Sequence, residues 1–219
     1  MILSLTQNQL LEQVNKTIRT AISQFYYQPH LFFNERGIQD YLFAVFYRNK
    51  FFSSSNLTLT KDGKKVNLVH SEYQSAERIP EKWRACYDMV ILNPEFIKKY
   101  DYSRVTNKLM SDYTKCPYQK GDLLAVFELK LIQQKNKTYF KQLEKDYNSL
   151  MNAKESLLKY MIVFSSIKDD LDFLRDKEWT DELRLIYIKV YFDKKNKKCV
   201  EILIKPNNFL NLPSNWIRK

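Results

Sequence analysis

The chain has 219 residues, of which 44% are hydrophobic and 15% aromatic, and its formal net charge is +11. This length and composition predict one folded domain with a full core and argue against disorder. Its three glycines form no glycine-rich phosphate loop, which argues against a P-loop ATPase or a Rossmann enzyme. The positive charge favours a polyanionic partner, although a lysine-rich composition typical of A/T-rich coding also explains part of it.

The cysteines and the N-terminus bear on the compartment. Cys86, Cys116 and Cys199 are widely spaced and form neither a metal-binding pattern nor a disulfide framework, which favours a reducing environment. The first residues lack the pattern of a signal peptide, and no apolar run is long enough to span a membrane. We therefore expect a cytoplasmic protein with no membrane partner.

Two helices are predicted first. Residues 6–27 carry an apolar stripe at helical spacing, and Pro29 separates them from the next helix. The second helix begins after Asn34, a good N-cap residue, and continues to about residue 47. Glu35 falls in register with the apolar positions of this helix and is expected on its core side. A first-turn acid favoured by the helix dipole is the alternative.

A hairpin and two acidic strands follow. Residues 57–73 are predicted to form a hairpin that turns at Asp62 and Gly63. The run from residue 87 to residue 92 is an apolar strand with Asp88 near its start, and the apolar run 123–127 continues into Glu128 and Lys130. Side chains two apart on a strand point to the same face, so Glu128 and Lys130 project together. If the two strands are neighbours, their carboxylates converge.

Two convergent carboxylates and a lysine suit chemistry at a phosphodiester. Carboxylate oxygens bind Mg²⁺, which keeps several waters and contacts phosphate oxygens. The cation would activate a water molecule, and the lysine would hold that water or neutralise the developing negative charge. The alternative is an ordinary ion pair where the strand reaches solvent.

The segment between the two acidic strands, residues 93–121, interleaves basic side chains with tyrosines. Basic and aromatic side chains together suit the neutralisation of phosphates and the stacking of bases. A solvated loop in a lysine- and tyrosine-rich protein is the alternative. The candidate nucleic-acid contacts, including one arginine just before the first acidic strand, are Arg84, Lys98, Lys99, Arg104, Lys108 and Lys115.

A third helix is predicted over residues 138–153, with Gln142 and Asp146 one turn apart. We expect Asp146 on a solvated face. A short apolar strand, residues 160–165, follows this helix. A charged helical segment, residues 168–182, then precedes a final hairpin formed by residues 184–192 and 198–204.

The order of these elements and the position of the acids resemble the PD-(D/E)XK nuclease superfamily, which has a restriction-endonuclease-like fold. Its signature is an acidic residue on one strand and acid-x-Lys on the next. Asp88 matches the first position, and Glu128 and Lys130 match the others, while Tyr87 replaces the proline of the signature. The resemblance covers about residues 34–166. It implies an α/β fold with an αβββαβ core, in which helices flank a mixed central sheet.

The resemblance also implies roles for five side chains. Asp88 and Glu128 would bind one or two Mg²⁺ ions, for which Mn²⁺ can substitute, and Lys130 would position or activate water. Glu35 matches the glutamate that many members carry on their first helix, facing the metal. Gln142 matches a glutamine that some members carry on the helix after the acid-x-Lys strand.

We therefore expect one nuclease-like domain over residues 1–219, with an N-terminal helix (6–27), a core (34–166) and a C-terminal helix and hairpin (168–205). The expected activity is that of a Mg²⁺-dependent deoxyribonuclease, an endonuclease that hydrolyses DNA. A nucleic-acid-binding protein that keeps the fold without cleaving, and a nuclease acting on RNA, are the alternatives. DNA is the expected partner, and a homodimer or a partner subunit is compatible with this interpretation.

Overall fold

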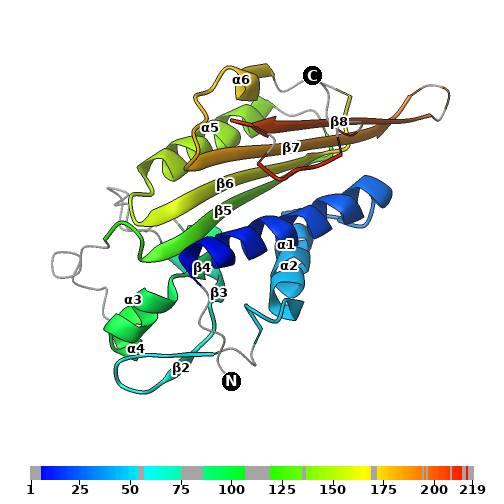
Figure 1. Cartoon of the computed structure of the whole chain (residues 1–219). Helices are drawn as coiled ribbons and strands as arrows, with labels where there is room; N and C mark the ends of the chain where they lie inside the picture. Colours follow the sequence, from blue (N-terminus) through cyan, green and yellow to red (C-terminus); the bar gives the residue numbers. More distant parts are fainter. Residues whose placement is uncertain are drawn as a thin grey trace.

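The computed structural model describes residues 6–53, 57–74, 86–106, 119–134, 137–168, 172–193, 195, 197–207, 209–213 and 216. These residues form an α/β structure in which helices cover both faces of a six-stranded mixed sheet (Figure 1). The α/β class and the mixed, helix-flanked sheet predicted from the sequence are confirmed. Within the described residues, we find no helix that combines the length and the apolar character needed to cross a membrane.

The sheet has the strand order β3-β4-β5-β6-β7-β8. Its strands are β3 (Val69–Gln74), β4 (Cys86–Leu92), β5 (Leu123–Ile132), β6 (Ser156–Ser165), β7 (Leu183–Phe192) and β8 (Lys198–Lys205). β5, β6 and β7 run parallel to one another, and the other neighbours are antiparallel. Because β5 and β6 are parallel, the chain needs a crossover between them, and α5 (Lys137–Asn152) provides it.

The two N-terminal helices pack on the opposite face of the sheet from α5 (Figure 1). They are α1 (Gln7–Tyr27) and α2 (Glu35–Arg48). Asn34 caps α2 as expected, because its side-chain oxygen accepts a hydrogen bond of 2.8 Å from the backbone N–H of Gly37. Three further helices are short: α3 (Pro94–Lys99), α4 (Tyr102–Val105) and α6 (Asp172–Arg175).

The predicted hairpin over residues 57–73 forms only in part. β1 (Thr58–Leu59) pairs with β2 (Lys65–Val66) around Gly63, whose φ of 77° suits glycine. The chain then leaves this hairpin, and β3 pairs with β4 in the main sheet. Val66 and Leu68 are buried at even positions, and Val69 and Tyr73 are buried at odd positions, so the alternation changes phase between Leu68 and Val69, where the chain passes to its new partner.

The helix predicted over residues 168–182 is also shorter than expected, and the structure has only the four-residue α6 in its described part. The segment after α6 packs by side-chain contacts instead. The Trp179 indole N–H donates to the backbone oxygen of Leu174 at 2.7 Å, and the Tyr147 hydroxyl donates to the backbone oxygen of Glu178 at 2.9 Å. These contacts use carbonyl groups that a longer helix would bond internally.

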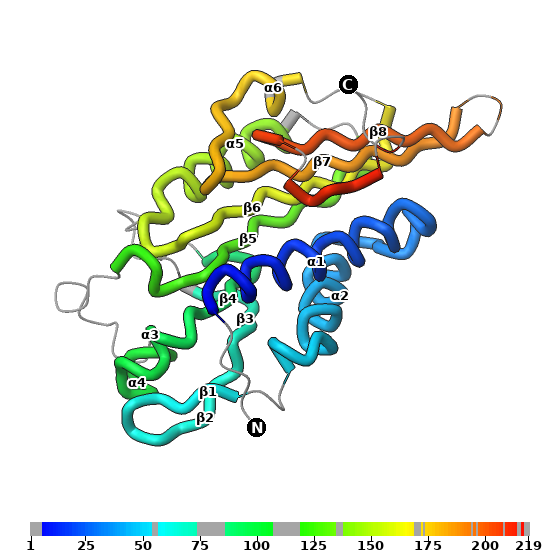
Figure 2. The backbone as a smooth tube through the Cα atoms, viewed as in Figure 1, coloured from blue at the N-terminus to red at the C-terminus, as the bar shows by residue number. Residues whose placement is uncertain are grey.

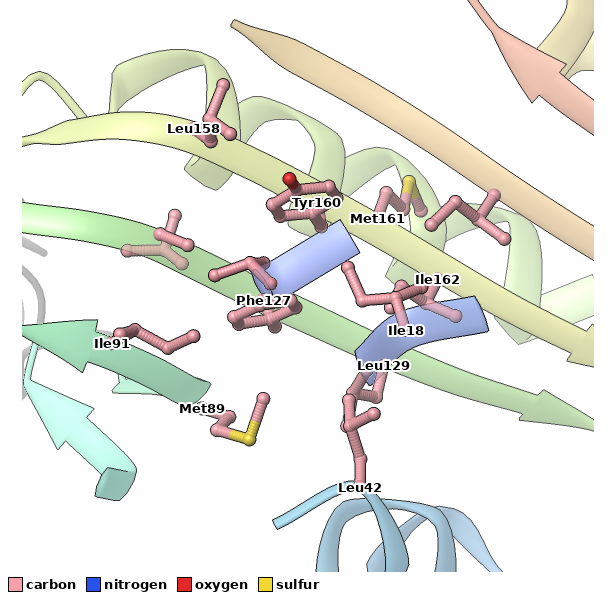
Figure 3. Packing of buried hydrophobic residues seen from close by; sticks show 14 of the residues in the cluster. Ile18, Leu42, Met89, Ile91, Phe127, Leu129, Leu158, Tyr160, Met161 and Ile162 are labelled. Atoms are coloured by element: carbon pink, nitrogen blue, oxygen red, sulfur yellow. The ribbon is translucent and has the colours of Figure 1, made fainter. Parts of the chain in front are cut away.

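The core centres on β5. Phe127 stacks on Tyr160 of β6 with ring centroids 5.0 Å apart, and lies 5.7 Å from the ring of Phe46 on α2. Figure 3 shows Phe127 and Leu129 on the side of β5 that faces α1 and α2, with Ile18 and Leu42 beside them. The alternation of strand side chains therefore sends Glu128 and Lys130 to the other face of β5.

Truncating the central ring should cost the most stability. We expect Phe127→Ala to lower the free energy of unfolding by about 3–5 kcal/mol, because it leaves a cavity between two layers. Urea denaturation measures this change. Phe140→Ala, which truncates an exposed ring on α5, is the matched control and should cost less than about 1 kcal/mol. Equal losses in the two variants would contradict this description of the core.

Candidate active site

The candidate site lies where β4 separates from β5. The two strands pair from Leu92 opposite Leu123 as far as Met89 opposite Phe127. Leu129 is the residue after Glu128 on β5. Its backbone N–H donates to Oδ2 of Asp88 at 2.7 Å. Where the backbone pairing of β4 and β5 ends, the Asp88 carboxylate thus accepts this hydrogen bond in place of a backbone carbonyl. The same register, continued by one residue, sets Asp88 opposite Glu128.

Asp88 and Glu128 bring two carboxyl groups together in a place with little water. Glu128 is only 5% exposed, and its carboxyl lies within hydrogen-bonding reach of the Asp88 carboxyl. Burial raises the pKa of Asp88 to about 6, against the opposing effects of the Leu129 hydrogen bond and the Lys130 charge. Burial, together with the negative charges of Asp88 and Asp146, raises the pKa of Glu128 well above its ordinary value.

Lys130 lies between helices from the two faces of the sheet. Its Nζ is 3.2 Å from Oε2 of Glu35 on α2 and 3.1 Å from Oδ2 of Asp146 on α5. Burial disfavours the charge of Lys130, but the carboxylates of Asp146, Glu35 and Asp88 outweigh that effect and raise its pKa. The lysine is therefore a fixed positive charge held by two carboxylates.

A buried glutamine supports Asp88 from behind. The Gln39 amide of α2 donates to the backbone oxygen of Asp88 and, at 3.3 Å, to Oε1 of Glu72. Glu72 itself has a φ of 53°, a left-handed backbone conformation that is strained for a glutamate. Such strain costs on the order of 1–3 kcal/mol and is concentrated at functional sites in proteins. Arg36 holds Glu72 from the solvent side at 3.2 Å.

Asp88 and Glu128 are the side chains that would hold a divalent cation. Their oxygens are hard ligands, and burial, followed by the charges of neighbouring carboxylates, raises the pKa of both groups, so a bound cation would favour their ionised forms. In the part of the chain that the structure describes, no three acidic, histidine or cysteine side chains converge as a metal-binding group. Mg²⁺ does not need three, because it commonly binds through one or two carboxylates and keeps its remaining waters.

The structure brings together Asp88, Glu128, Lys130 and Glu35, and it adds two residues that sequence reasoning missed. Asp146 is half-buried and contacts Lys130, so it does not lie on the solvated face expected for it. Its spacing from the buried Leu143 and Leu150 was the signal for this position. Gln39 could have been found because it lies one helical turn after Glu35.

Gln142 lies one turn before Asp146 on α5, and its side chain is exposed. It is thus on the same helix as the carboxylate that contacts Lys130, at a position open to solvent. A ligand could reach Gln142 from outside the site.

The candidate nucleic-acid contacts divide into two groups. Arg84, Lys108 and Lys115 lie outside the described residues. Lys98, Lys99 and Arg104 belong to α3 and α4, which follow the Leu92 end of β4, whereas Asp88 lies near the other end.

The basic side chains of α3 and α4 have partners within the protein. Lys98 pairs with Glu95 at 2.7 Å, Lys99 donates to Gln119 at 3.1 Å, and the Arg104 guanidinium lies 3.8 Å from the centre of the Tyr100 ring. Leu92 is four residues after Asp88 on β4, a rise of about 13 Å along the strand. A polynucleotide that touches both the site and α3 would therefore run along β4.

Comparisons of the chain with protein-family models, with curated proteins and with solved structures find no significant match. The chemistry of the site therefore has to be inferred from its own geometry.

The raised pKa of Asp88 predicts that stability falls as pH rises. Because the folded-state pKa of about 6 exceeds the ordinary value of 3.8, the stabilisation is complete below about pH 4 and is lost as pH rises through about 6. In EDTA, Glu128→Gln should remove one of the two repelling charges and make the protein more stable at pH 8 by about 1–3 kcal/mol. Urea denaturation at pH 5 and pH 8 measures both effects.

Glu12→Gln, which neutralises an exposed carboxylate on α1, is the matched control and should leave the pH dependence unchanged. A wild-type protein that is equally stable at both pH values, together with a destabilised Glu128→Gln, would show that the two carboxyl groups do not repel each other.

Proposed function

We propose that this protein is a Mg²⁺-dependent nuclease of the PD-(D/E)XK superfamily and that it hydrolyses phosphodiester bonds in DNA. The observation that carries the proposal is the meeting of Asp88, Glu128 and Lys130 where β4 leaves β5. Apart from β1 and β2, which follow α2, and α3 and α4, which follow β4, the element order is α2-β3-β4-β5-α5-β6, and this order supports the proposal because a restriction-endonuclease-like αβββαβ core has it. The net charge of +11 favours a polyanionic substrate.

The two carboxylates would hold the cation. When bound there, Mg²⁺ would lower the pKa of a coordinated water and offset negative charge on the phosphate oxygens. Asp88 contributes Oδ1 most readily, because Oδ2 already accepts the backbone N–H of Leu129 at 2.7 Å. That hydrogen bond fixes the orientation of the carboxylate before any ligand arrives, which favours a preorganised site.

Lys130 acts in this scheme as a donor and not as a base. Its raised pKa keeps the ammonium charged at neutral pH, so it donates hydrogen bonds to the attacking water or to a phosphate oxygen. Asp146 and Glu35 hold the ammonium from two sides and so determine its position. A fixed positive charge in a site with little water stabilises developing negative charge more strongly than one in bulk water.

A protein that only binds nucleic acid has no need for this arrangement. Two neighbouring buried carboxyl groups lower the stability of the metal-free protein, and they repel a phosphate backbone. A cation turns the same groups into a phosphate-binding site. The cost of the arrangement therefore favours catalysis over binding alone.

The proposal predicts that the purified protein cleaves plasmid DNA with Mg²⁺ or Mn²⁺ and not in EDTA. Lys130→Met keeps most of the apolar stem and removes the ammonium, so we expect cleavage to fall by about a hundredfold or more. Rates of plasmid nicking measure this loss. Lys16→Met, which removes an exposed lysine on α1, is the matched control and should keep most of the cleavage rate.

Glu128→Gln should also abolish cleavage, because the variant loses affinity for Mg²⁺. Mn²⁺ broadens the nuclear magnetic resonance signals of nuclei near its binding site, and this broadening should be lost in the variant. If Lys130→Met cleaves at the wild-type rate, the active site lies elsewhere. If wild-type protein binds DNA in Mg²⁺ and never cleaves it, the protein is a binding module.

Asp146 is a positioning residue in this scheme. Asp146→Asn removes one of the three carboxylates that raise the pKa of Lys130, so the lysine should lose its proton at a lower pH. We expect the pH–rate profile to lose activity earlier on its alkaline side, with cleavage near pH 7 reduced by about tenfold. A lower rate with an unchanged alkaline limb would show that Asp146 serves the fold alone.

A further inference from the structure

The loop between α1 and α2 exposes apolar side chains beside the candidate site. Pro29 and Phe32 anchor this loop in the protein, while Tyr27, the last residue of α1, and Phe33 of the loop are 66% and 86% exposed. Leu31 is exposed as well. Burying these side chains would be favourable, so their accumulation on one loop indicates a surface that a ligand covers.

The turn between β7 and β8 extends this surface. His30 stacks on Phe192 with ring centroids 5.8 Å apart, and Phe192 is 49% exposed. Lys198 of β8 donates to the backbone oxygen of Tyr26, and its Nζ lies 5.9 Å from the Tyr27 ring. Figure 2 shows the β7–β8 turn and the C-terminal end of α1 at the same end of the molecule. We call Tyr27, His30, Phe33, Phe192 and Lys198 the aromatic surface.

The aromatic surface is connected to the candidate site through the loop itself. Phe33 is two residues before Glu35, whose carboxylate contacts Lys130. The Gln133 amide, just beyond the end of β5, donates to the backbone oxygen of Phe32 at 3.0 Å and so holds the loop against the strand that carries Glu128 and Lys130. A ligand on Phe33 would therefore lie next to the start of α2, which carries Glu35.

The charge of this surface indicates the class of ligand. Lys195 and Lys197 are exposed at the β7–β8 turn, next to Lys198. The nearest acid on this turn, Asp193, directs one carboxylate oxygen to the backbone N–H groups of Lys195 and Lys197, at 2.8 and 2.9 Å. Exposed rings interleaved with lysines complement a chain of bases and phosphates.

Exposed rings distinguish between forms of nucleic acid. The bases of a duplex already stack on one another, so their faces are covered. Unpaired bases have free faces, and each one stacks on an aromatic ring whatever its identity. We propose that the aromatic surface binds unpaired bases, so that the substrate is a nucleic acid with a single-stranded segment next to the bond that is cleaved. The cleavage step of this inference rests on the proposed function, whereas the binding step does not.

The test measures binding in a Glu128→Gln background, where cleavage does not interfere. Fluorescence anisotropy with labelled oligodeoxyuridylate, oligouridylate and a blunt DNA duplex compares the three ligands. Phe33→Ala should weaken binding of the single strands by about five- to tenfold, and adding Tyr27→Ala and Phe192→Ala should weaken it further. Binding of the duplex should change less than about twofold, since phosphate contacts alone hold it.

Met151→Ala, which truncates an exposed apolar side chain on α5, is the matched control and should leave all affinities unchanged. Thermal unfolding checks that each variant folds. The two single-stranded ligands separate DNA from RNA, because preference for one of them identifies the sugar that the surface accepts. Equal losses on single strands and duplex, or no loss on either, would overturn the inference.

Cleavage by the protein with Glu128 intact separates this inference from the proposed function. A forked duplex should be cleaved faster than a blunt one, and Phe33→Ala should remove the difference. If single-strand binding depends on Phe33 but nothing is cleaved, the surface stands and the nuclease proposal fails. If blunt and forked DNA are cleaved equally and Phe33→Ala changes neither, the nuclease proposal stands and this inference fails. If the variants alter only self-association, the surface is a protein interface and the inference is overturned.

Discussion

Two carboxyl groups, those of Asp88 and Glu128, repel each other where β4 leaves β5, in a place that water reaches poorly. The protein can accommodate both in three ways: by protonating them, by placing a positive charge nearby, or by binding a cation between them. Lys130 supplies the nearby charge, but Asp146 and Glu35 already share it. Negative groups therefore outnumber positive ones in the site. This imbalance is the feature from which the proposed Mg²⁺ site follows.

The surrounding fold serves to keep these groups together. α2 contributes Glu35 and Gln39 from one face of the sheet, and α5 contributes Asp146 from the other (Figure 1). Both helices pack on β5, so the position of Lys130 depends on the core around Phe127. The strained backbone of Glu72, opposite Asp88, adds a local cost that the rest of the fold has to support. Stability given up at the site is consistent with a functional role for it.

The sequence predicts the strand residues of the site better than the helix residues. Asp88, Glu128 and Lys130 stand out because each interrupts or ends an apolar run, and the period of a strand then fixes their common face. Asp146 and Gln39 are polar residues on amphipathic helices, where a polar side chain is ordinary. Their burial depends on how α5 and α2 meet the sheet, which helical spacing alone does not specify.

The misassigned elements have a related cause. The alternation over residues 57–73 changes phase between Leu68 and Val69, but the phase change alone does not reveal that the residues after it pair with β4 and not with the first arm. The segment 168–182 has helical composition, yet the Tyr147 hydroxyl of α5 bonds the backbone oxygen of Glu178, and the Trp179 indole bonds that of Leu174 within the segment. Long-range contacts outweighed local preference in both places.

The central claim is that Asp88 and Glu128 form a protonated pair that exchanges its proton for a divalent cation. Carbon-13 nuclear magnetic resonance of the side-chain carboxyl groups, followed through a pH titration with and without Mg²⁺, measures this directly. Without metal, the signal of Asp88 should titrate at about 6 and that of Glu128 well above its ordinary value. With saturating Mg²⁺, both transitions should move to lower pH. Two carboxyl groups that titrate at ordinary values, or that do not respond to Mg²⁺, would contradict the account.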